Sequence, residues 1–363
     1  MSNSLRRMAL LLVVLLLIAV PCAAGIAPKN IILFIGDGMG FGQVTATEYE
    51  CAARNRELAL ASMPITGFAL TNPANNLVTD SAAGASALAT GVKTTNGTIA
   101  LDPEGKRLRT ILEAAREMGK STGVVTTDNI TGATPAAFYA HVRTRGQQDD
   151  IAAQLISARV NVALGSGKSR FVPTTTEKPG REDGRDILAD AKKRGYDVVF
   201  TGESLKSSGS DRIIGLFSDE TFPTLTEMTS TAISLLSRNR KGFFLMSESS
   251  RIDGGGHGND QKRVVQGVIA LDDALSAAIK FAKTEGNTLI IVTADHETGG
   301  MAVQNPDAGN PAFTSQWTGK GHTANMVPIY AYGPGSEEFS GTRDNTEIAK
   351  ICAGLWRVKD VSP

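Results

Sequence analysis

Short runs of β-branched and other apolar residues alternate along this chain with segments of helical periodicity. The first run, residues 31–35 (IILFI), ends at Gly36-Asp37-Gly38 and is typical of a buried strand. Similar runs occupy residues 123–127, 160–164, 197–201, 242–247, 288–293 and 328–332. Helical patterns occupy residues 109–118, 149–158, 185–194, 225–237, 264–283 and 346–356. The alternation predicts an α/β fold, a three-layer sandwich whose mostly parallel central sheet is covered by helices on both faces.

The charge balance of the chain excludes some classes of partner. The 363 residues include 37 Lys and Arg against 37 Asp and Glu, so the formal net charge is zero. A general nucleic-acid binder or a polybasic membrane-surface protein would need an excess of positive charge. Three cysteines are too few for a disulfide-built scaffold, and the sequence leaves open whether Cys51 and Cys352 pair.

The first 24 residues have the pattern of a secretory signal peptide. Arg6 and Arg7 precede an uncharged apolar run over residues 8–20, and Pro21 and small residues follow it. The run is too short to span a bilayer comfortably, which favours cleavage near Ala24 over the alternative of an uncleaved anchor. We therefore expect a periplasmic or secreted protein with no stable membrane anchor. No repeat or long linker interrupts residues 25–363, which predicts a single domain.

Carboxylates and imidazoles gather after several of the predicted strands. In open α/β sheets ligands bind outside the carboxyl ends of the strands, so these side chains are expected to meet at one edge. The candidates are Asp37, Thr134, Glu248, Asp253, His257, Asp295, His296 and His322. They include three of the four histidines, each predicted on a glycine-rich or acidic loop, whereas His141 is predicted on a helix and is expected to be structural. Imidazole with carboxylate suits zinc, and an oxygen-only set suits a harder cation.

Ser81 begins a predicted alanine-rich helix in the segment VTDSAAGASALATG. A helix N-terminus favours bound anions, which makes this serine a candidate nucleophile. Serine is also a common residue at helix starts, and the G-x-S-x-G pattern is absent around Ser81. The position alone therefore does not assign catalysis.

Taken together, the motifs resemble the alkaline phosphatase family. NIILFIGDGMG, VTDSAAGASALATG, TGATPAAFYAHVRTR, SESSRIDGGGHGND, VTADHETGGM and GKGHT occur in the family's order over residues 30–323. The resemblance implies a single alkaline phosphatase-like catalytic domain over residues 25–363. It also implies that phosphate monoesters are hydrolysed through a phosphoserine at Ser81.

The resemblance further implies two Zn²⁺ and one Mg²⁺ as cofactors. The two zinc sites would be formed by Asp37, Asp295 and His296, next to the serine, and by Asp253, His257 and His322. The magnesium site would be formed by Asp37, Thr134 and Glu248. Arg145, in HVRTR, would bind two phosphate oxygens with its planar guanidinium.

Two glycines depart from the family's pattern. The best-known bacterial member has Asp where this chain has Gly132, and Lys where this chain has Gly254. These departures leave the metal preference and the phosphate affinity open. The short span between His296 and His322 indicates a compact member, for which a homodimer is allowed by the resemblance but less firmly implied.

Other proteins on the same metal scaffold are alternatives. A sulfatase would need C-x-P-x-R around its nucleophile, whereas Ser81 is followed by Ala82-Ala83. A phosphodiesterase often lacks the third cation site, whereas Thr134 and Glu248 are both present. A mutase or synthase on this fold and a non-catalytic periplasmic binder of metal or phosphate are further alternatives.

Overall fold

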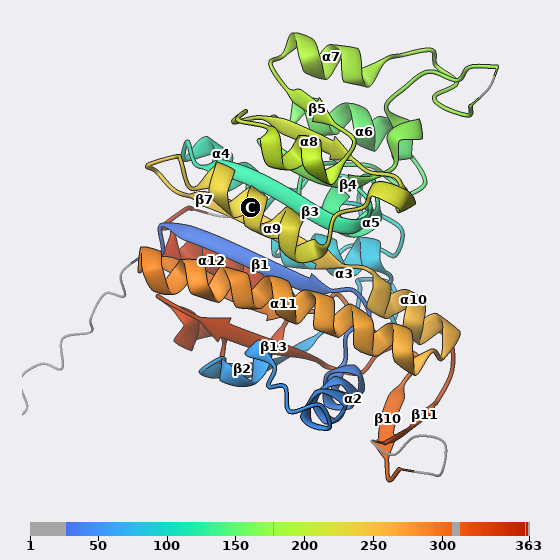
Figure 1. The fold of residues 1–363 in the computed structure, drawn as a ribbon, viewed down its shortest axis with the longest axis vertical. Coiled ribbons are helices and arrows are strands. Elements are labelled where there is room, and N and C mark those ends of the chain that lie inside the picture. Colours follow the sequence, from blue (N-terminus) through green and yellow to red (C-terminus); the bar gives the residue numbers. More distant parts are fainter. Residues whose placement is uncertain (1–26, 177, 307–312, 360, 362–363) are drawn as a thin grey trace, which may run out of the picture.

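The computed structural model describes residues 27–176, 178–306, 313–359 and 361, so the expected signal peptide lies outside the described residues. A ten-stranded sheet runs through the middle of the molecule (Figure 1). In spatial order its strands are β14 (Gly341–Asp344), β2 (Ile65–Leu70), β13 (Val327–Tyr332), β8 (Thr288–Thr293), β1 (Asn30–Gly36), β7 (Phe243–Ser249), β3 (Ser121–Asn129), β4 (Val162–Ser166), β6 (Ile213–Leu216) and β5 (Asp197–Val199).

The sheet is mostly parallel, which confirms the predicted architecture. Among its neighbouring strands only β13 is antiparallel, to both β2 and β8. The central strand β1 pairs in parallel with β7 on one side and β8 on the other, and all of its residues are buried. Strands covered on both faces have continuous apolar runs, which the central strands show. All seven strands expected from the sequence are present.

Helices cover both faces of the sheet. One layer contains α2 (Phe41–Ala52), α9 (Leu225–Leu236), α10 (Arg251–Gly258) and the long α11 (Gln261–Glu285), which lies over β1, β7 and β8. The other contains α3 (Ser81–Thr90), α4 (Ile111–Glu117), α5 (Ala133–Ala136) and α12 (Thr346–Leu355), which pack on one another. In Figure 1, α11 crosses in front of the sheet and α12 lies behind it.

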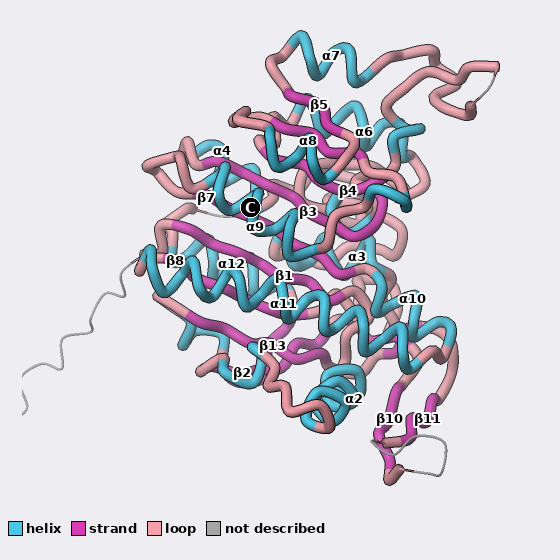
Figure 2. The backbone as a smooth tube through the Cα atoms, in the orientation of Figure 1, coloured by secondary structure: helices cyan, strands magenta, loops and turns pink. Residues whose placement is uncertain are grey.

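The remaining elements extend the two ends of the sheet. At the β5 end lie α6 (Gln148–Ser157), α7 (Ile187–Lys193) and α8 (Gly202–Ser207). Two small ribbons, β10 (Met301–Gln304) with β11 (Thr314–Trp317) and β9 (Glu297–Thr298) with β12 (His322–Thr323), follow β8 in the chain. Figure 2 shows the β10–β11 ribbon projecting beyond α2 and α10.

The alanine-rich helix α3 begins at Ser81, as expected, and all of its residues are buried. Small side chains let it pack closely, since a Cβ at Gly84 would lie 2.7 Å from the carbonyl oxygen of Asp295. The Asp80 side chain caps the helix by accepting the Ala83 N–H at 3.0 Å. The close packing at Gly84 places the start of α3 directly against the loop that follows β8.

Two predictions about local structure were wrong. Residues 251–258, read as a glycine loop, form α10, so Asp253 and His257 lie one turn apart on a helix. The glycines are tolerated there because the helix packs directly on neighbouring segments: a Cβ at Gly256 would lie 2.7 Å from the Thr298 carbonyl oxygen. His141, predicted on a helix, lies in an irregular segment after α5.

Candidate active site

Three adjacent strands carry the acidic candidates to one edge of the sheet. Asp37 follows β1, Glu248 lies near the end of β7, and Asp295 follows β8. In the register of the sheet, Ile35 of β1 is level with Glu248 on one side and with Thr293 on the other. Because the strands are parallel and aligned, their carboxylates converge as expected from the sequence.

The first cluster, which we call the inner cluster, consists of Asp37, Asp295 and His296. One ligand atom from each lies within 4.8 Å of the others. His296 Nε2 lies 3.4 Å from Asp37 Oδ1 and 3.3 Å from Asp295 Oδ2. These two carboxylate oxygens are buried and have no hydrogen-bond partner among the described residues. A buried oxygen without a donor is costly, and a divalent cation between the three ligand atoms would satisfy both oxygens.

Ser81 lies against the inner cluster. Its Oγ is 3.2 Å from His296 Nε2, and the residue is 4% exposed, so the hydroxyl is nearly enclosed at the N-terminus of α3. The same imidazole nitrogen thus faces the serine and both carboxylates. This arrangement places the hydroxyl where a cation held by the inner cluster would touch it.

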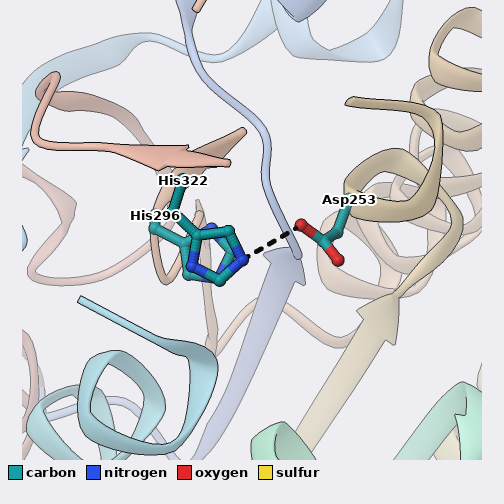
Figure 3. A group of neighbouring side chains, drawn as sticks. All are labelled: Asp253, His296 and His322. Carbon is teal, nitrogen blue, oxygen red and sulfur yellow. Dashed lines mark ion pairs between the residues drawn. The ribbon is translucent and has the colours of Figure 1, made fainter. Parts of the chain in front are cut away.

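The second cluster, which we call the outer cluster, is built around Asp253. Its Oδ1 lies 3.5 Å from His322 Nε2 and 3.3 Å from His257 Nε2. Figure 3 shows Asp253 across from His296 and His322, whose rings stack with centroids 3.6 Å apart. The tightest group of ligand atoms here joins Asp253 to His296 and His322, within 4.8 Å. His257 contacts Asp253 from the next turn of α10 and is more exposed than the other two histidines. His296 belongs to both groups of ligand atoms.

Hydrogen bonds to the Nδ1 atoms orient all three imidazoles. His257 Nδ1 lies 2.5 Å from the Lys320 carbonyl oxygen, and His322 Nδ1 lies 2.9 Å from that of Thr79. A carbonyl oxygen only accepts, so each Nδ1 carries a proton. Thr298 donates its hydroxyl proton to Asp253 Oδ1 at 2.6 Å, and therefore accepts from His296 Nδ1 at 3.2 Å. Each Nε2 is left facing the clusters, the orientation that metal-binding histidines adopt.

The third group offers oxygen atoms only. Glu248 is 2% exposed and accepts a hydrogen bond from the Thr126 hydroxyl. Thr134, on α5, lies near Glu248 and opposes the rise in the Glu248 pKa that burial causes, and the Glu248 charge acts on the nearby Asp37. Two carboxylates and a hydroxyl fit a hard cation such as Mg²⁺.

The carboxylates of the inner cluster and Glu248 have strongly raised pKa values. Burial, followed by repulsion from Asp295, Asp253 and Glu248, raises the pKa of Asp37 well above its usual range. Burial and neighbouring carboxylates raise the pKa of Asp295 to about 7 and that of Glu248 to about 8. Several buried like charges are unfavourable together, which is the electrostatic condition that bound cations relieve.

The outer cluster has the opposite electrostatics. Burial would raise the pKa of Asp253, but hydrogen bonds from His322 and Thr298 and the nearby imidazoles lower it to about 2. Burial opposes a charge on His322, yet the bonds to Asp253 and Thr79 raise its pKa. By contrast, burial and the neighbouring His322 lower the pKa of His296 to about 3. His322 can therefore hold a proton where a cation would lie, and His296 cannot.

Arg145 lies at the open side of the site. Its Nη1 donates to Asp80 Oδ2 at 3.2 Å, while Asp80 Oδ1 accepts the N–H of Gly97. Burial raises the pKa of Asp37 and lowers that of His296, and the guanidinium opposes the first shift and adds to the second, so its charge acts on the inner cluster. The side chain is 43% exposed, which leaves it available to an anionic ligand.

The two glycines that depart from the family's pattern are faced by other side chains. A Cβ at Gly254 would lie 2.5 Å from the guanidinium of Arg263, and one at Gly132 would lie 3.9 Å from Asp128 Oδ2. The Arg263 guanidinium thus lies beside Gly254, whereas the atom nearest to a Cβ at Gly132 would be the Asn129 carbonyl oxygen at 2.9 Å, with the Asp128 carboxylate farther away. His141 has a structural environment: its Nδ1 lies 3.0 Å from the Ala100 carbonyl oxygen and its Nε2 lies 3.3 Å from Glu113.

Sequence reasoning missed the residues that hold the ligands in place. Thr298 bridges His296 and Asp253, and Thr126 donates to Glu248. The signal available was a hydroxyl residue close to each predicted ligand, two positions after His296 in one case and within the strand beside Glu248 in the other.

Cys51 and Cys352 are both buried free thiols.

A parallel α/β sheet with carboxylate and imidazole clusters at its carboxyl edge, beside a buried serine, defines a metal-dependent hydrolase. The family model for alkaline phosphatase matches residues 28–316 and 303–357. Alkaline phosphatase 4 of Bacillus subtilis (strain 168) is 34% identical over 412 residues, which cover 89% of this chain and 87% of that protein. The alkaline phosphatase of Escherichia coli (strain K12) is 34% identical over 399 residues, covering 88% and 84% respectively.

Solved structures agree. The alkaline phosphatase from the Antarctic bacterium TAB5 superposes with a TM-score of 0.83 at 35% identity, covering 91% of this chain and 99% of that one. The chain therefore belongs to the alkaline phosphatase family, and it is a metal-dependent phosphomonoesterase. No helix within the described residues is long and apolar enough to cross a membrane.

Proposed function

We propose that the protein hydrolyses phosphate monoesters in two steps through a phosphoserine at Ser81. In the first step a bond forms between Ser81 Oγ and phosphorus, the bond from phosphorus to the ester oxygen breaks, and the alcohol leaves. The serine proton passes to solvent, and the leaving alkoxide takes a proton from water. In the second step water displaces the serine oxygen and inorganic phosphate is released. The observation that carries this proposal is the 3.2 Å approach of Ser81 Oγ to His296 Nε2.

We assign two Zn²⁺ and one Mg²⁺ to the three groups of side chains. The inner zinc would be held by Asp37, Asp295 and His296, the outer zinc by Asp253, His257 and His322, and magnesium by Asp37, Thr134 and Glu248. When bound, the cations supply positive charge that favours an ionised serine and stabilises the leaving oxygen. The orphaned oxygens of Asp37 and Asp295 and the oriented Nε2 atoms support this ligand assignment.

Arg145 would bind the phosphate group. Its guanidinium fork matches two phosphate oxygens, and Asp80 limits its movement through the 3.2 Å contact while also capping α3. Because phosphoryl transfer depends mainly on positioning and charge stabilisation, this contact would contribute to both binding and turnover.

The biological setting is part of the same proposal. Residues 1–24 would be a signal peptide that directs the protein to the periplasm or outside the cell, and residues 25–363 would form one catalytic domain. The zero formal charge suits a small phosphate ester as the substrate better than a nucleic acid. A homodimer is the oligomeric state that we propose to test by light scattering.

The decisive experiment compares p-nitrophenyl phosphate with bis-p-nitrophenyl phosphate, with and without chelator, for the wild type and Ser81→Ala. We expect the monoester to be preferred, chelator to abolish activity, and phosphate label to be trapped at acid pH only on the wild type. Preference for the diester would favour the phosphodiesterase alternative. Label on the Ser81→Ala protein would reject this serine as the nucleophile.

A further inference from the structure

Glu297 is a buried carboxylate beside the site, and neither cluster uses it as a ligand. It lies between His296 and Thr298 in the chain and is 3% exposed. Its oxygens accept hydrogen bonds from the Gln43 side chain at 2.6 Å, from the Gly300 N–H at 2.9 and 3.1 Å, and from the Met301 N–H at 3.3 Å. The Thr323 hydroxyl also donates to Glu297 Oε2. All of these partners are uncharged donors.

The partners of Glu297 belong to the segments that carry both clusters. Gln43 lies in the first turn of α2, directly after the loop that contains Asp37. Thr323 follows His322 in β12, and it pairs with Glu297 in the register of β9 and β12. One carboxylate therefore connects three segments that are far apart in the sequence, while its own neighbour in the chain is the shared ligand His296.

Gln43 extends the same connection. Its Oε1 accepts the N–H of Gly40 at 3.0 Å, and its Nε2 donates to the Thr298 carbonyl oxygen at 2.8 Å as well as to Glu297. The backbone is packed to fit this arrangement, because a Cβ at Gly40 would lie 2.2 Å from Glu297 Cγ. The Asp37 loop therefore rests directly on the Glu297 side chain.

We infer that Glu297 is a positioning residue that holds the Asp37, His296 and His322 segments in register, so that both zinc sites are assembled before a cation binds. This inference rests on the proposed zinc sites. A carboxylate suits the role because both of its oxygens accept, whereas an amide in its place would direct a donor at the donors of Gly300 or Gln43. Glu297 touches neither substrate nor cation in this role, and acts only through the ligands that it aligns.

The test uses Glu297→Gln in the full-length zinc protein, with Asp272→Asn as the matched control. Asp272 is equally buried and accepts the N–H groups of Ala59 and Leu60 at 3.0 and 2.9 Å, on α11 away from the clusters. Zn²⁺ affinity is measured by competition with a chelator, and ligand geometry by the visible spectrum of the Co²⁺-substituted protein. We expect Glu297→Gln to bind Zn²⁺ about 10- to 100-fold more weakly and to change the Co²⁺ spectrum.

Asp272→Asn is expected to lower the thermal unfolding temperature without changing Zn²⁺ affinity or the Co²⁺ spectrum. An unchanged affinity and spectrum in Glu297→Gln would overturn the inference. It would also be overturned if Asp272→Asn weakened Zn²⁺ binding as much as Glu297→Gln does. If Glu297→Gln does not fold, Gln43→Ala replaces it, for which we expect a smaller loss of Zn²⁺ affinity in the same direction. A wild-type protein that binds no zinc would instead refute the proposed zinc sites, which separates the two failures.

Discussion

The inner and outer clusters have similar ligands but opposite electrostatics. In the inner cluster Asp295 and His296 are fully buried, and burial raises the pKa of Asp295 to about 7. In the outer cluster the half-buried Asp253 has its pKa lowered to about 2, and the pKa of the partner His322 is raised. Burial raises the pKa of both carboxyls, and the partners account for the difference: the imidazoles and the Thr298 hydroxyl outweigh burial at Asp253, whereas the buried Oδ2 of Asp295 has no hydrogen-bond partner among the described residues. The outer cluster forms a carboxylate–imidazolium pair without a cation, whereas the inner cluster depends on one, or on protons, to neutralise its acids.

The largest expected effect is therefore at the inner cluster. Asp295→Asn removes one negative charge and one ligand next to Ser81, and we expect kcat to fall by about 10³-fold, comparable with the loss of a central catalytic group. Metal content and kcat measured at saturating Zn²⁺ check this prediction. An Asp295→Asn variant that keeps full activity and binds as much zinc as the wild type would show that the inner cluster does not depend on this carboxylate.

Arg145→Ala has a smaller expected effect because it leaves both clusters intact. Losing a charge-assisted contact to phosphate is expected to weaken inhibition by inorganic phosphate by about 10- to 100-fold. Turnover should fall but remain measurable. Arg145→Lys is the matched control: it restores the charge without the planar fork and should recover only part of the affinity. Phosphate inhibition equal to that of the wild type would remove Arg145 from the site.

His257→Ala tests the outer cluster at its most exposed member. His257 contacts Asp253 at 3.3 Å, while the tighter group of ligand atoms contains His322 and His296. We expect activity to fall by about 10-fold at limiting Zn²⁺ and to recover at high Zn²⁺, because a lost ligand lowers affinity before it removes the site. Activity that does not recover at any Zn²⁺ concentration would show that the outer cluster is no less sensitive than the inner one.

Much of the fold could be predicted because its central strands are buried on both faces. In the central sheet the strands missed were β2, β6 and β14, each interrupted or begun by a glycine, with β2 and β14 at one end of the sheet. The short strands β9 to β12 outside that sheet were also missed. Strands β2 and β14 are partly exposed and β6 is only four residues long, so their apolar patterns are too weak to distinguish them from loops.

The candidate ligands could be predicted because strand ends converge in a parallel sheet, and the structure brings them to that edge. The assignment of each ligand to one cluster could not be predicted from the strand ends, because His296 lies in both groups of ligand atoms. The helix at 251–258 was also missed, because its four glycines disfavour a helix locally, and close packing against Thr298 overrides this preference. Contacts of this kind depend on segments far apart in the sequence.

The final and smallest effect is on stability rather than activity. The folded-state pKa values of Asp295 and Glu248, about 7 and about 8, lie above their ordinary values of 3.8 and 4.5. Such groups favour the folded state below their ordinary pKa, and that contribution is lost as pH rises through the folded pKa. The raised pKa of His322 acts in the same direction, whereas the lowered pKa of His296 destabilises the fold only below its ordinary 6.5.

Between about pH 6.5 and pH 8, metal-stripped protein should therefore lose about 1 kcal/mol of unfolding free energy per pH unit for each carboxyl still protonated. Denaturant unfolding of the chelator-treated protein at several pH values measures this slope. Asp295→Asn should have a shallower slope, since one of the titrating groups is gone. Zinc-loaded protein should not become less stable over this range, because bound cations favour ionised ligands. A metal-stripped protein that gains stability as the pH rises would contradict the prediction that ionising the buried carboxyls destabilises the fold when no cation is bound.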